Sequence, residues 1–126
     1  MNYKNFINNE WFNSDSGNTF EVVNPYTEKV IANVPASGKS DIDKAVRAAQ
    51  VAFKGWSTMT AGGRRDYLQA LAQKSMDHAD SLAKIISIEM GKPLKDAMTE
   101  IEDLSEYLQY YSELARDQVG RIVSPV

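Results

Sequence analysis

The segment 63–93 constrains the fold most strongly, because it carries the longest apolar stripe in the chain and ends in Gly-Lys-Pro. Small and apolar residues recur there every three or four positions: Leu68, Leu71 or Ala72, Ser75, Ala79, Leu82, Ile86 and Met90. This spacing predicts one buried face of an α-helix. Gly91 can adopt the left-handed conformation that closes a helix, and Pro93 is suited to the first position of the next one.

Weaker apolar content around His78 predicts a break inside this segment. We therefore expect two helices that roughly continue one another, over residues 64–77 and 80–90. Asp77 or Asp80 could cap the second of them, because a short carboxylate side chain accepts hydrogen bonds from the first amides of a helix.

The residues before this segment predict another amphipathic helix, over residues 40–56. Ser40 is a suitable N-cap, and Asp43 three residues later completes a pattern that resembles a capping box. The residues that share its apolar face are Ile42, Ala45, Val46, Ala49, Ala52, Phe53 and Trp56. Residues 57–63 are expected to break the helix.

The most acidic part of the chain follows Pro93, in a helix that we expect to end at Gly120. Its apolar stripe comprises Leu94, Ala97, Met98, Ile101, Leu104, Leu108, Tyr111 and Ala115. Between residues 94 and 118, seven acidic residues stand against two basic ones, which gives a local net charge of −5. Such acidity usually indicates a solvated face, or one that meets a basic neighbour.

Turn signals divide the first 36 residues into two hairpins. Asn8-Asn9 tolerates positive φ and predicts a tight turn between two short strands. A second turn is expected at residues 15–18. Residues 19–34 are rich in β-formers around Asn24-Pro25, a strong turn signal, and predict the second hairpin.

These patterns divide the chain into a β arm (1–36), a helical segment (37–120) and the start of a further strand (121–126). A terminal strand without a following partner would be an unpaired edge, so we expect a natural chain to continue beyond it. The expected fold of these residues is mostly α-helical, with a short N-terminal β-hairpin arm.

Composition excludes several classes of function. The 126 residues, 43% hydrophobic and 25% charged, fit one soluble domain or part of a larger one. The net charge of −3 argues against nonspecific nucleic-acid binding. Without cysteine, the chain has no disulfide, thiolate metal site or cysteine nucleophile of its own. The N-terminus lacks a signal-peptide pattern and no apolar run reaches about 20 residues, so we expect a cytoplasmic protein without a membrane partner.

The residues themselves assign no catalytic, cofactor-binding or metal-ligating position. Gly62-Gly63 lacks the third glycine and the preceding strand of a dinucleotide fingerprint. His78 is the only histidine, and with Asp77 and Asp80 beside it a hydrogen-bonded surface position is favoured over a ligand or a base.

Two clusters could support chemistry but have simpler explanations. A solvated helix face accounts for the carboxylates Glu100, Glu102, Asp103 and Glu106. Aromatic residues that could stack a ligand are Trp11, Trp56, Tyr107, Tyr110 and Tyr111. Helical spacing beside leucines favours core and interface positions for these rings, with the phenol groups reaching water.

Taken together and in this order, the residues resemble the start of the NAD(P)-dependent aldehyde dehydrogenases. Three pieces carry the resemblance: Asn24-Pro25 with its short turn into Val30-Ile31, the helix that ends at Trp56, and the run from Glu89 to Leu94. The resemblance covers essentially the whole chain. It implies an α/β parent fold in which this region packs helices on the cofactor-binding domain, while the early strands lie near the oligomerisation region.

The resemblance also implies a parent enzyme that oxidises an aldehyde to a carboxylic acid with NAD or NADP. In the family a cysteine attacks the aldehyde to form a thiohemiacetal, hydride passes to the nicotinamide, and activated water hydrolyses the thioester. The residues that do this are expected beyond residue 126. This chain alone is therefore expected to be inactive, with the remainder of the same enzyme as its partner and a homo-oligomer as the assembly.

Two finer implications concern ligands. Some relatives hold a structural alkali cation near Val22-Val23 with a carboxylate at the position of Glu100, for which helix surface is the simpler explanation. The run from Glu89 to Leu94 resembles the succinate-semialdehyde type more than the betaine-aldehyde type.

A different hypothesis is a free-standing helical interaction module that docks a basic partner through its acidic helix 94–118. The two hypotheses differ in what they predict for the surface. If the chain is part of a larger enzyme, the apolar faces that would cover the cofactor domain should be exposed, or buried by self-association.

Overall fold

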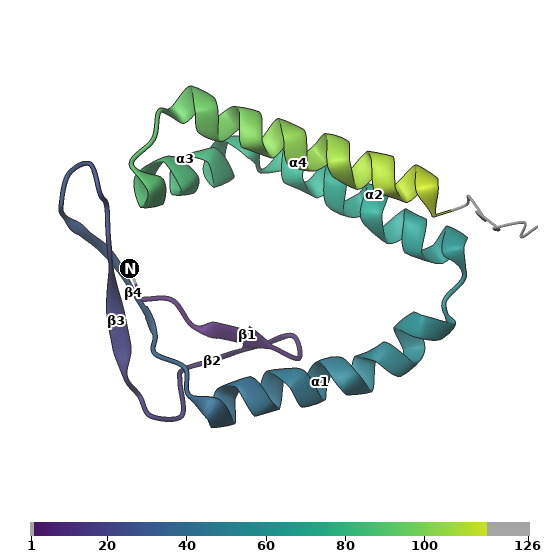
Figure 1. The fold of residues 1–126 in the computed structure, drawn as a ribbon, viewed down its shortest axis with the longest axis horizontal. Helices are drawn as coiled ribbons and strands as arrows, with labels where there is room; N and C mark the ends of the chain where they lie inside the picture. Colours follow the sequence, from purple (N-terminus) through teal and green to yellow (C-terminus); the bar gives the residue numbers. More distant parts are fainter. Residues whose placement is uncertain (1, 116–126) are drawn as a thin grey trace, which may run out of the picture.

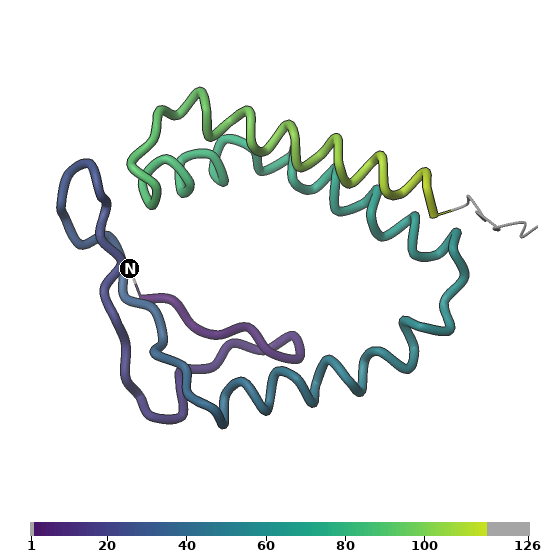
Figure 2. Tube along the Cα trace, viewed as in Figure 1, coloured from purple at the N-terminus to yellow at the C-terminus, as the bar shows by residue number. Residues whose placement is uncertain are grey.

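The computed structural model describes residues 2–115, and within this range strands precede helices. The elements are β1 (Asn5–Ile7), β2 (Glu10–Phe12), β3 (Thr19–Val23), β4 (Val30–Pro35), α1 (Lys39–Thr58), α2 (Ala61–Asp77), α3 (Ala79–Met90) and α4 (Leu94–Leu114). They form an open ring, with α2, α3 and α4 in one half and α1 with both hairpins in the other (Figures 1 and 2). No helix in the described range is long and apolar enough to cross a membrane. The mostly helical fold with a β-hairpin arm is as predicted.

The first hairpin confirms the prediction from Asn8-Asn9. Strands β1 and β2 pair antiparallel, with Ile7 opposite Glu10. Asn8 and Asn9 have φ of 52° and 63°. A two-residue turn whose central residues both have positive φ matches the right-handed twist of the flanking strands, and asparagine tolerates that conformation.

The second hairpin joins β3 to β4 in an antiparallel pair. The Asn24 side-chain oxygen accepts hydrogen bonds from the Tyr26 and Thr27 amides at 2.8 and 3.0 Å, which builds the turn. Strand β4 extends to Pro35, one residue beyond the predicted end of the hairpin.

Helix α1 begins one residue earlier than predicted, and Ser40 is not its cap. The N-cap is Gly38, whose amide donates to Asp41 Oδ2 at 2.9 Å. Asp43 forms an ion pair with Lys39 instead of a capping box. The error arose because serine is a common cap, whereas here a carboxylate inside the first turn performs that function.

The break after α1 is shorter than predicted. Only Met59 and Thr60 separate α1 from α2, because the Thr60 hydroxyl accepts a hydrogen bond from the Gly63 amide at 3.1 Å. This cap lets α2 start at Ala61, so Gly62-Gly63 lies in its first turn. An N-cap side chain offsets the unfavourable helix propensity of glycine.

The break at His78 and the termination at Gly91 are confirmed. His78 separates α2 from α3, although neither Asp77 nor Asp80 caps the new helix. Gly91 closes α3 with φ of 66°. Helix α4 starts after Pro93 and ends at Leu114, short of the predicted end at Gly120. Residues 116–126, which include Gly120 and the predicted strand at 121–126, lie outside the described residues. The division into domains at residues 36 and 120 stays a prediction.

Small side chains form the contact between the helices. The buried cluster comprises Ala79, Ala83, Ala97 and Ile101, with Leu82, Ile86 and Met98 packed against it. Helix α2 packs along α4, and the buried residues there include Ala72, Ser75 and Ser105. The side chains at a contact determine how closely helix axes approach, so alanine and serine allow close packing.

Several of the larger apolar residues of the predicted stripes are not in the core. Met90, Leu94, Leu104 and Tyr111 are exposed, contrary to the prediction, and of the alternatives Leu71 and Ala72 it is Ala72 that is buried. Helix α1 differs most, because its only buried residue is Asp41. Its predicted core face is open, with Ile42 57% and Phe53 63% exposed.

Candidate functional site

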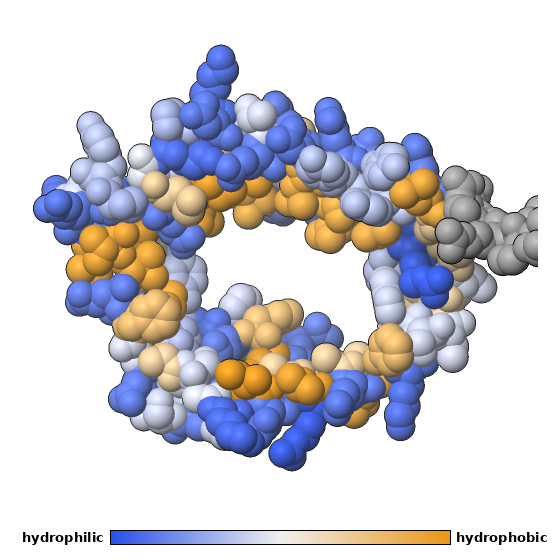
Figure 3. Space-filling model, viewed as in Figure 1, coloured by the Kyte–Doolittle hydropathy of each residue, from blue (hydrophilic) through white to orange (hydrophobic). Residues whose placement is uncertain are grey.

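The exposed apolar surface is the most extensive candidate site in the described part of the chain. We define it as the large hydrophobic side chains that are exposed on the helices: Ile42, Val46, Val51, Phe53, Trp56, Leu71, Met76, Ile85, Ile88, Met90, Leu94, Leu104 and Leu114. Figure 3 shows apolar residues gathered on both sides of the central opening, over α1 below and over the α2–α4 half above. Its geometry suits a partner that fills the ring.

The amount of surface supports this interpretation. The chain exposes 10044 Å², whereas a compact monomer of 14.1 kDa is expected to expose about 6,700 Å². The difference is on the order of 3,000 Å². Obligate interfaces bury about 2,000–5,000 Å² counted over both partners, or roughly 1,000–2,500 Å² on each, so the chain has enough surface to supply its side of such an interface. The prediction that apolar faces would be exposed is confirmed.

One contact that closes the ring lies where the β3–β4 turn meets the end of α3. A Cβ on Gly91 would lie 2.9 Å from Pro25 Cγ and 3.0 Å from the Tyr26 nitrogen. The Asn24 and Gly91 segments together line a cavity of about 410 Å³. Two of the three sequence pieces that carry the family resemblance therefore touch in space.

Polar contacts stabilise the turn between α3 and α4 beside this junction. The Ser87 hydroxyl donates to the Lys92 carbonyl at 2.7 Å. The Lys92 ammonium forms an ion pair with Glu100, which lies nearly two turns into α4. Glu100, which the family resemblance suggested as a cation ligand, is therefore already paired with a cation of the chain.

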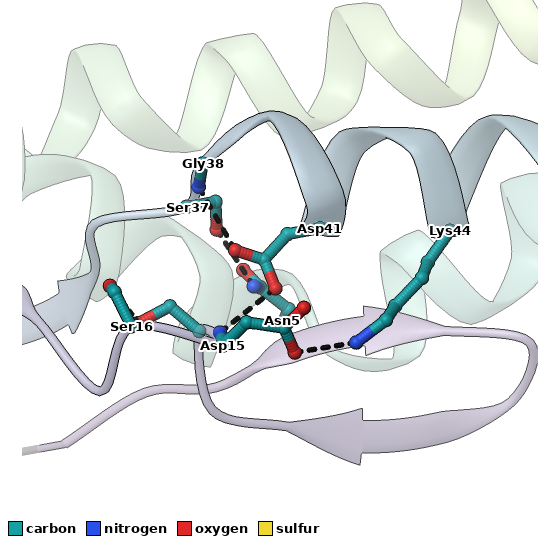
Figure 4. A network of polar contacts seen from close by, with 8 residues as sticks. Asn5, Asp15, Ser16, Ser37, Gly38, Asp41 and Lys44 are labelled. Carbon is teal, nitrogen blue, oxygen red and sulfur yellow. Dashed lines mark hydrogen bonds and ion pairs between the residues drawn. The ribbon is translucent and has the colours of Figure 1, made fainter.

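The N-terminus of α1 is joined to the β1–β2 hairpin through a network centred on Asp41 (Figure 4). The Asp41 carboxylate is buried and accepts from the Asp15 amide at 3.0 Å and the Gly38 amide at 2.9 Å. Asn5 Nδ2 donates to Ser37 Oγ at 2.7 Å. One short side chain thus caps the helix and holds the loop after β2.

Lys44 and Asp15 form an ion pair at the same place. Hydrogen bonds from Lys44, and to a lesser degree from Ser40, hold the pKa of Asp15 below its usual value. A lowered pKa in the folded state means that the stabilisation is present above the unfolded value and is lost as the pH falls through the folded value. Both side chains are exposed, so salt weakens the pair.

Asp41→Ala is expected to destabilise the chain by about 2 kcal/mol, because two amides lose their buried acceptor. Urea denaturation measures this loss, and hydrogen exchange at Gly38 and Asp15 should accelerate. Asp43→Ala is the matched control, since it removes an exposed ion pair that contributes less than about 0.5 kcal/mol. Equal losses for the two variants would contradict the structural role of Asp41.

The residues considered earlier for catalysis or metal binding are not brought together. His78 is exposed between α2 and α3, where its carbonyl accepts from the Ser81 hydroxyl at 2.8 Å. No three histidine or acidic residues among residues 2–115 are placed to hold a metal ion. Gly62-Gly63 follows a helix rather than a strand, so the described residues do not form the strand–turn–helix that holds a dinucleotide.

The five aromatic residues lie on the surface of the described chain, so none of them is in its core, and the prediction of interface positions stays a prediction. Trp11 is 63% exposed and packs against Phe6 with the rings tilted by 48° and their centroids 4.8 Å apart. Trp56 meets Tyr67 edge to face at 5.6 Å, which joins the end of α1 to α2. Tyr110 and Tyr111 contact each other and not a core.

Comparisons with known proteins agree with this geometry. Residues 11–125 match the model of the aldehyde dehydrogenase family. The chain is 38% identical to aminoaldehyde dehydrogenase 2 of Pisum sativum, covering 96% of the chain and 25% of that protein. It is 34% identical to the mitochondrial succinate-semialdehyde dehydrogenase of Arabidopsis thaliana, covering 94% of the chain and 22% of that protein.

Solved structures give the same result. The chain superposes on 3,6-anhydro-L-galactose dehydrogenase in complex with NAP with a TM-score of 0.90, at 32% identity over 99% of this chain and 26% of that one. For betaine aldehyde dehydrogenase of Staphylococcus aureus in complex with NAD+ the TM-score is 0.88, at 32% identity over 98% and 25% of the two chains. The chain spans about a quarter of the length of these relatives.

Proposed function

The chain belongs to the aldehyde dehydrogenase family, and we propose on this premise that it is the N-terminal part of an enzyme that oxidises an aldehyde to a carboxylic acid with NAD or NADP. Its own contribution is structural. The exposed apolar surface, on a chain whose total accessible surface exceeds that of a compact monomer by on the order of 3,000 Å², is the observation that carries the proposal. The remainder of the enzyme would fill the ring and bury the part of this surface that faces the ring.

The chemistry would come from that remainder. Covalent aldehyde oxidation needs a nucleophile, and this chain contains no cysteine. No strand–turn–helix for a dinucleotide is present in the described residues. What this chain supplies is a frame: the Gly91 junction and the Asp41 network fix its hairpins against its helices, so that the apolar surface is presented in one arrangement.

The purified 126-residue chain is expected to show no turnover with succinate semialdehyde and either NAD or NADP. The absorbance of the reduced nicotinamide measures this, against a positive control with a complete enzyme of the family. Cofactor reduction above the blank by the cysteine-free chain would overturn the proposal. Sequencing the gene beyond the codon for Val126 provides a second test, since an open frame with a later cysteine is expected.

The substrate class, the location and the assembly of the enzyme are proposed from its relatives and from composition. We propose a substrate of the succinate-semialdehyde class, because succinate-semialdehyde dehydrogenases of two plants are among the relatives at 34% and 32% identity. The relatives also include aminoaldehyde and D-glyceraldehyde dehydrogenases, so substrate profiling of the complete enzyme is the test. We further propose a cytoplasmic homo-oligomer, to be checked by fractionation and light scattering.

A second candidate function is the helical module that docks a basic partner through α4. The favouring observation is that its acidic side chains are exposed: Asp96, Glu100, Glu102, Asp103, Glu106 and Glu113. Binding of a basic peptide that weakens steeply with salt would support this function, because exposed charges are screened over about 10 Å at 0.1 M salt. If adding this chain restored activity to the remaining part of the enzyme, the result would favour the role as part of an aldehyde dehydrogenase instead.

A further inference from the structure

A groove of about 510 Å³ runs between the β1–β2 hairpin and one side of α1. Its apolar lining comes from both elements: Ile7 and Phe12 from the hairpin, and Ala48 and Val51 from the helix. The volume lies within the roughly 300–1,000 Å³ that small-molecule sites occupy, and such sites combine apolar walls with a few polar groups. This groove has both features.

The walls of the groove are held by the network of Figure 4. Asp41 holds the loop that follows β2, because its carboxylate accepts a hydrogen bond from the Asp15 amide at 3.0 Å. The Lys44–Asp15 ion pair joins α1 to the same loop. Asn5 donates to Ser37, which connects β1 to the residue before the cap of α1. The groove is therefore formed before any ligand enters, so the protein loses less conformational entropy when a ligand binds.

Among the charged side chains that line the groove in the described residues, Arg47 is the one that remains available, whereas the amides of Asn8 and Asn13 can both donate and accept. Both acidic side chains of the lining are already engaged, Asp41 with two backbone amides and Asp15 with Lys44. Arg47, Asn8 and Asn13 also line it, and within residues 2–115 their side chains form no hydrogen bond or ion pair to the protein. An arginine guanidinium matches a carboxylate in charge and geometry. The groove therefore favours a ligand with an apolar body that ends in an anionic acceptor.

We propose that this groove binds an amphipathic monocarboxylate, with its hydrocarbon chain against Ile7, Phe12 and Val51 and its carboxylate on Arg47. The charge selects the ligand: a neutral alcohol lacks the ionic contact, and an ammonium finds no free carboxylate, because Asp15 and Asp41 already have partners. The inference concerns residues of this chain alone and is independent of the proposed enzyme activity.

Titration of the 126-residue chain with octanoate tests the proposal, with octanol and octylamine as ligands of matched chain length. Octanoate is expected to shift the methyl resonances of Ile7 and Val51 and to leave Val46, on the other side of α1, unchanged. Arg47→Gln is expected to weaken octanoate binding by about tenfold, the effect of losing one charge-assisted hydrogen bond. Lys54→Gln is the matched control, because it removes a cation from the same exposed helix outside the groove.

Three results would overturn the proposal. The first is binding of octanoate, octanol and octylamine with equal affinity, which would make the groove an unselective apolar contact. The second is equal weakening by Arg47→Gln and Lys54→Gln, which would reduce the effect to net charge. The third is a shift of the Ile7 and Val51 methyl signals when the protein is concentrated, without any shift when octanoate is added. That result would mean that a second copy of the chain occupies the groove. Val51→Asp provides an independent check, since an anion in the apolar lining should abolish octanoate binding.

Discussion

Gly91→Ala is expected to lower the free energy of unfolding by about 3 kcal/mol, which for a chain of this size lowers the melting temperature by roughly 10 °C. Two costs add at this position. The left-handed backbone, at φ of 66°, costs an alanine about 1–2 kcal/mol. The new methyl group would also lie 2.9 Å from Pro25 and 3.0 Å from the Tyr26 nitrogen, so the β3–β4 turn must move.

Two other glycines separate these costs. Gly17 also has positive φ, at 70°, but a Cβ there would meet nothing within 4 Å, so Gly17→Ala bears the backbone cost alone. Gly55 lies inside α1 in open space, where alanine should stabilise the helix by up to about 1 kcal/mol. Thermal denaturation of the three variants measures the order of their melting temperatures. If Gly91→Ala lowered the free energy of unfolding no more than Gly17→Ala does, the β3–β4 turn would not be in close contact with the end of α3.

The purified chain is expected to self-associate, because its exposed apolar surface has no partner in isolation. Sedimentation should detect species larger than the 14.1 kDa monomer, in proportions that depend on concentration. Phe53→Glu should weaken this association by about tenfold or more, since burial of a large apolar side chain contributes about 1.5–3 kcal/mol. The side chain is 63% exposed in the monomer, so the substitution leaves the fold intact.

Gln50→Glu is the matched control for that variant. It adds the same charge to an exposed position of α1 but removes no apolar surface. Self-association that responds equally to both variants would reflect net charge and not the apolar surface. A monodisperse monomer over the full concentration range would contradict the interpretation of the ring as the frame of a larger enzyme.

Local signals predicted most of the elements, because the physics that decides them acts within a few residues. The asparagine pair of the first hairpin, the break at His78 and the closure at Gly91 each depend on backbone conformation near the residue itself. Boundaries failed where a neighbouring side chain took over the cap. Thr60 extended α2 backward over two glycines, and Asp41 replaced Ser40 at the start of α1.

The sequence also located the family, through pieces that the structure places in contact, but it did not show which faces are buried. Periodicity marks an apolar face without saying what covers it. On α2 and α4 the small residues Ala72, Ser75 and Ser105 make the helix contact, whereas Leu71 and Leu104 remain exposed. The stripe of α1 looks like a core face in sequence, but in the structure it is largely exposed, and Trp56 at its end meets Tyr67 of α2.

What the sequence alone determined was the order of the elements, the positions of most turns and the absence of a cysteine nucleophile. These follow from local conformational preferences and from composition. Only the tertiary structure placed Pro25 against Gly91, Asp41 between two loops and Arg47 above an apolar groove. Those contacts join residues far apart in the chain, and they depend on the distances between packed elements, which residue spacing along one element does not encode.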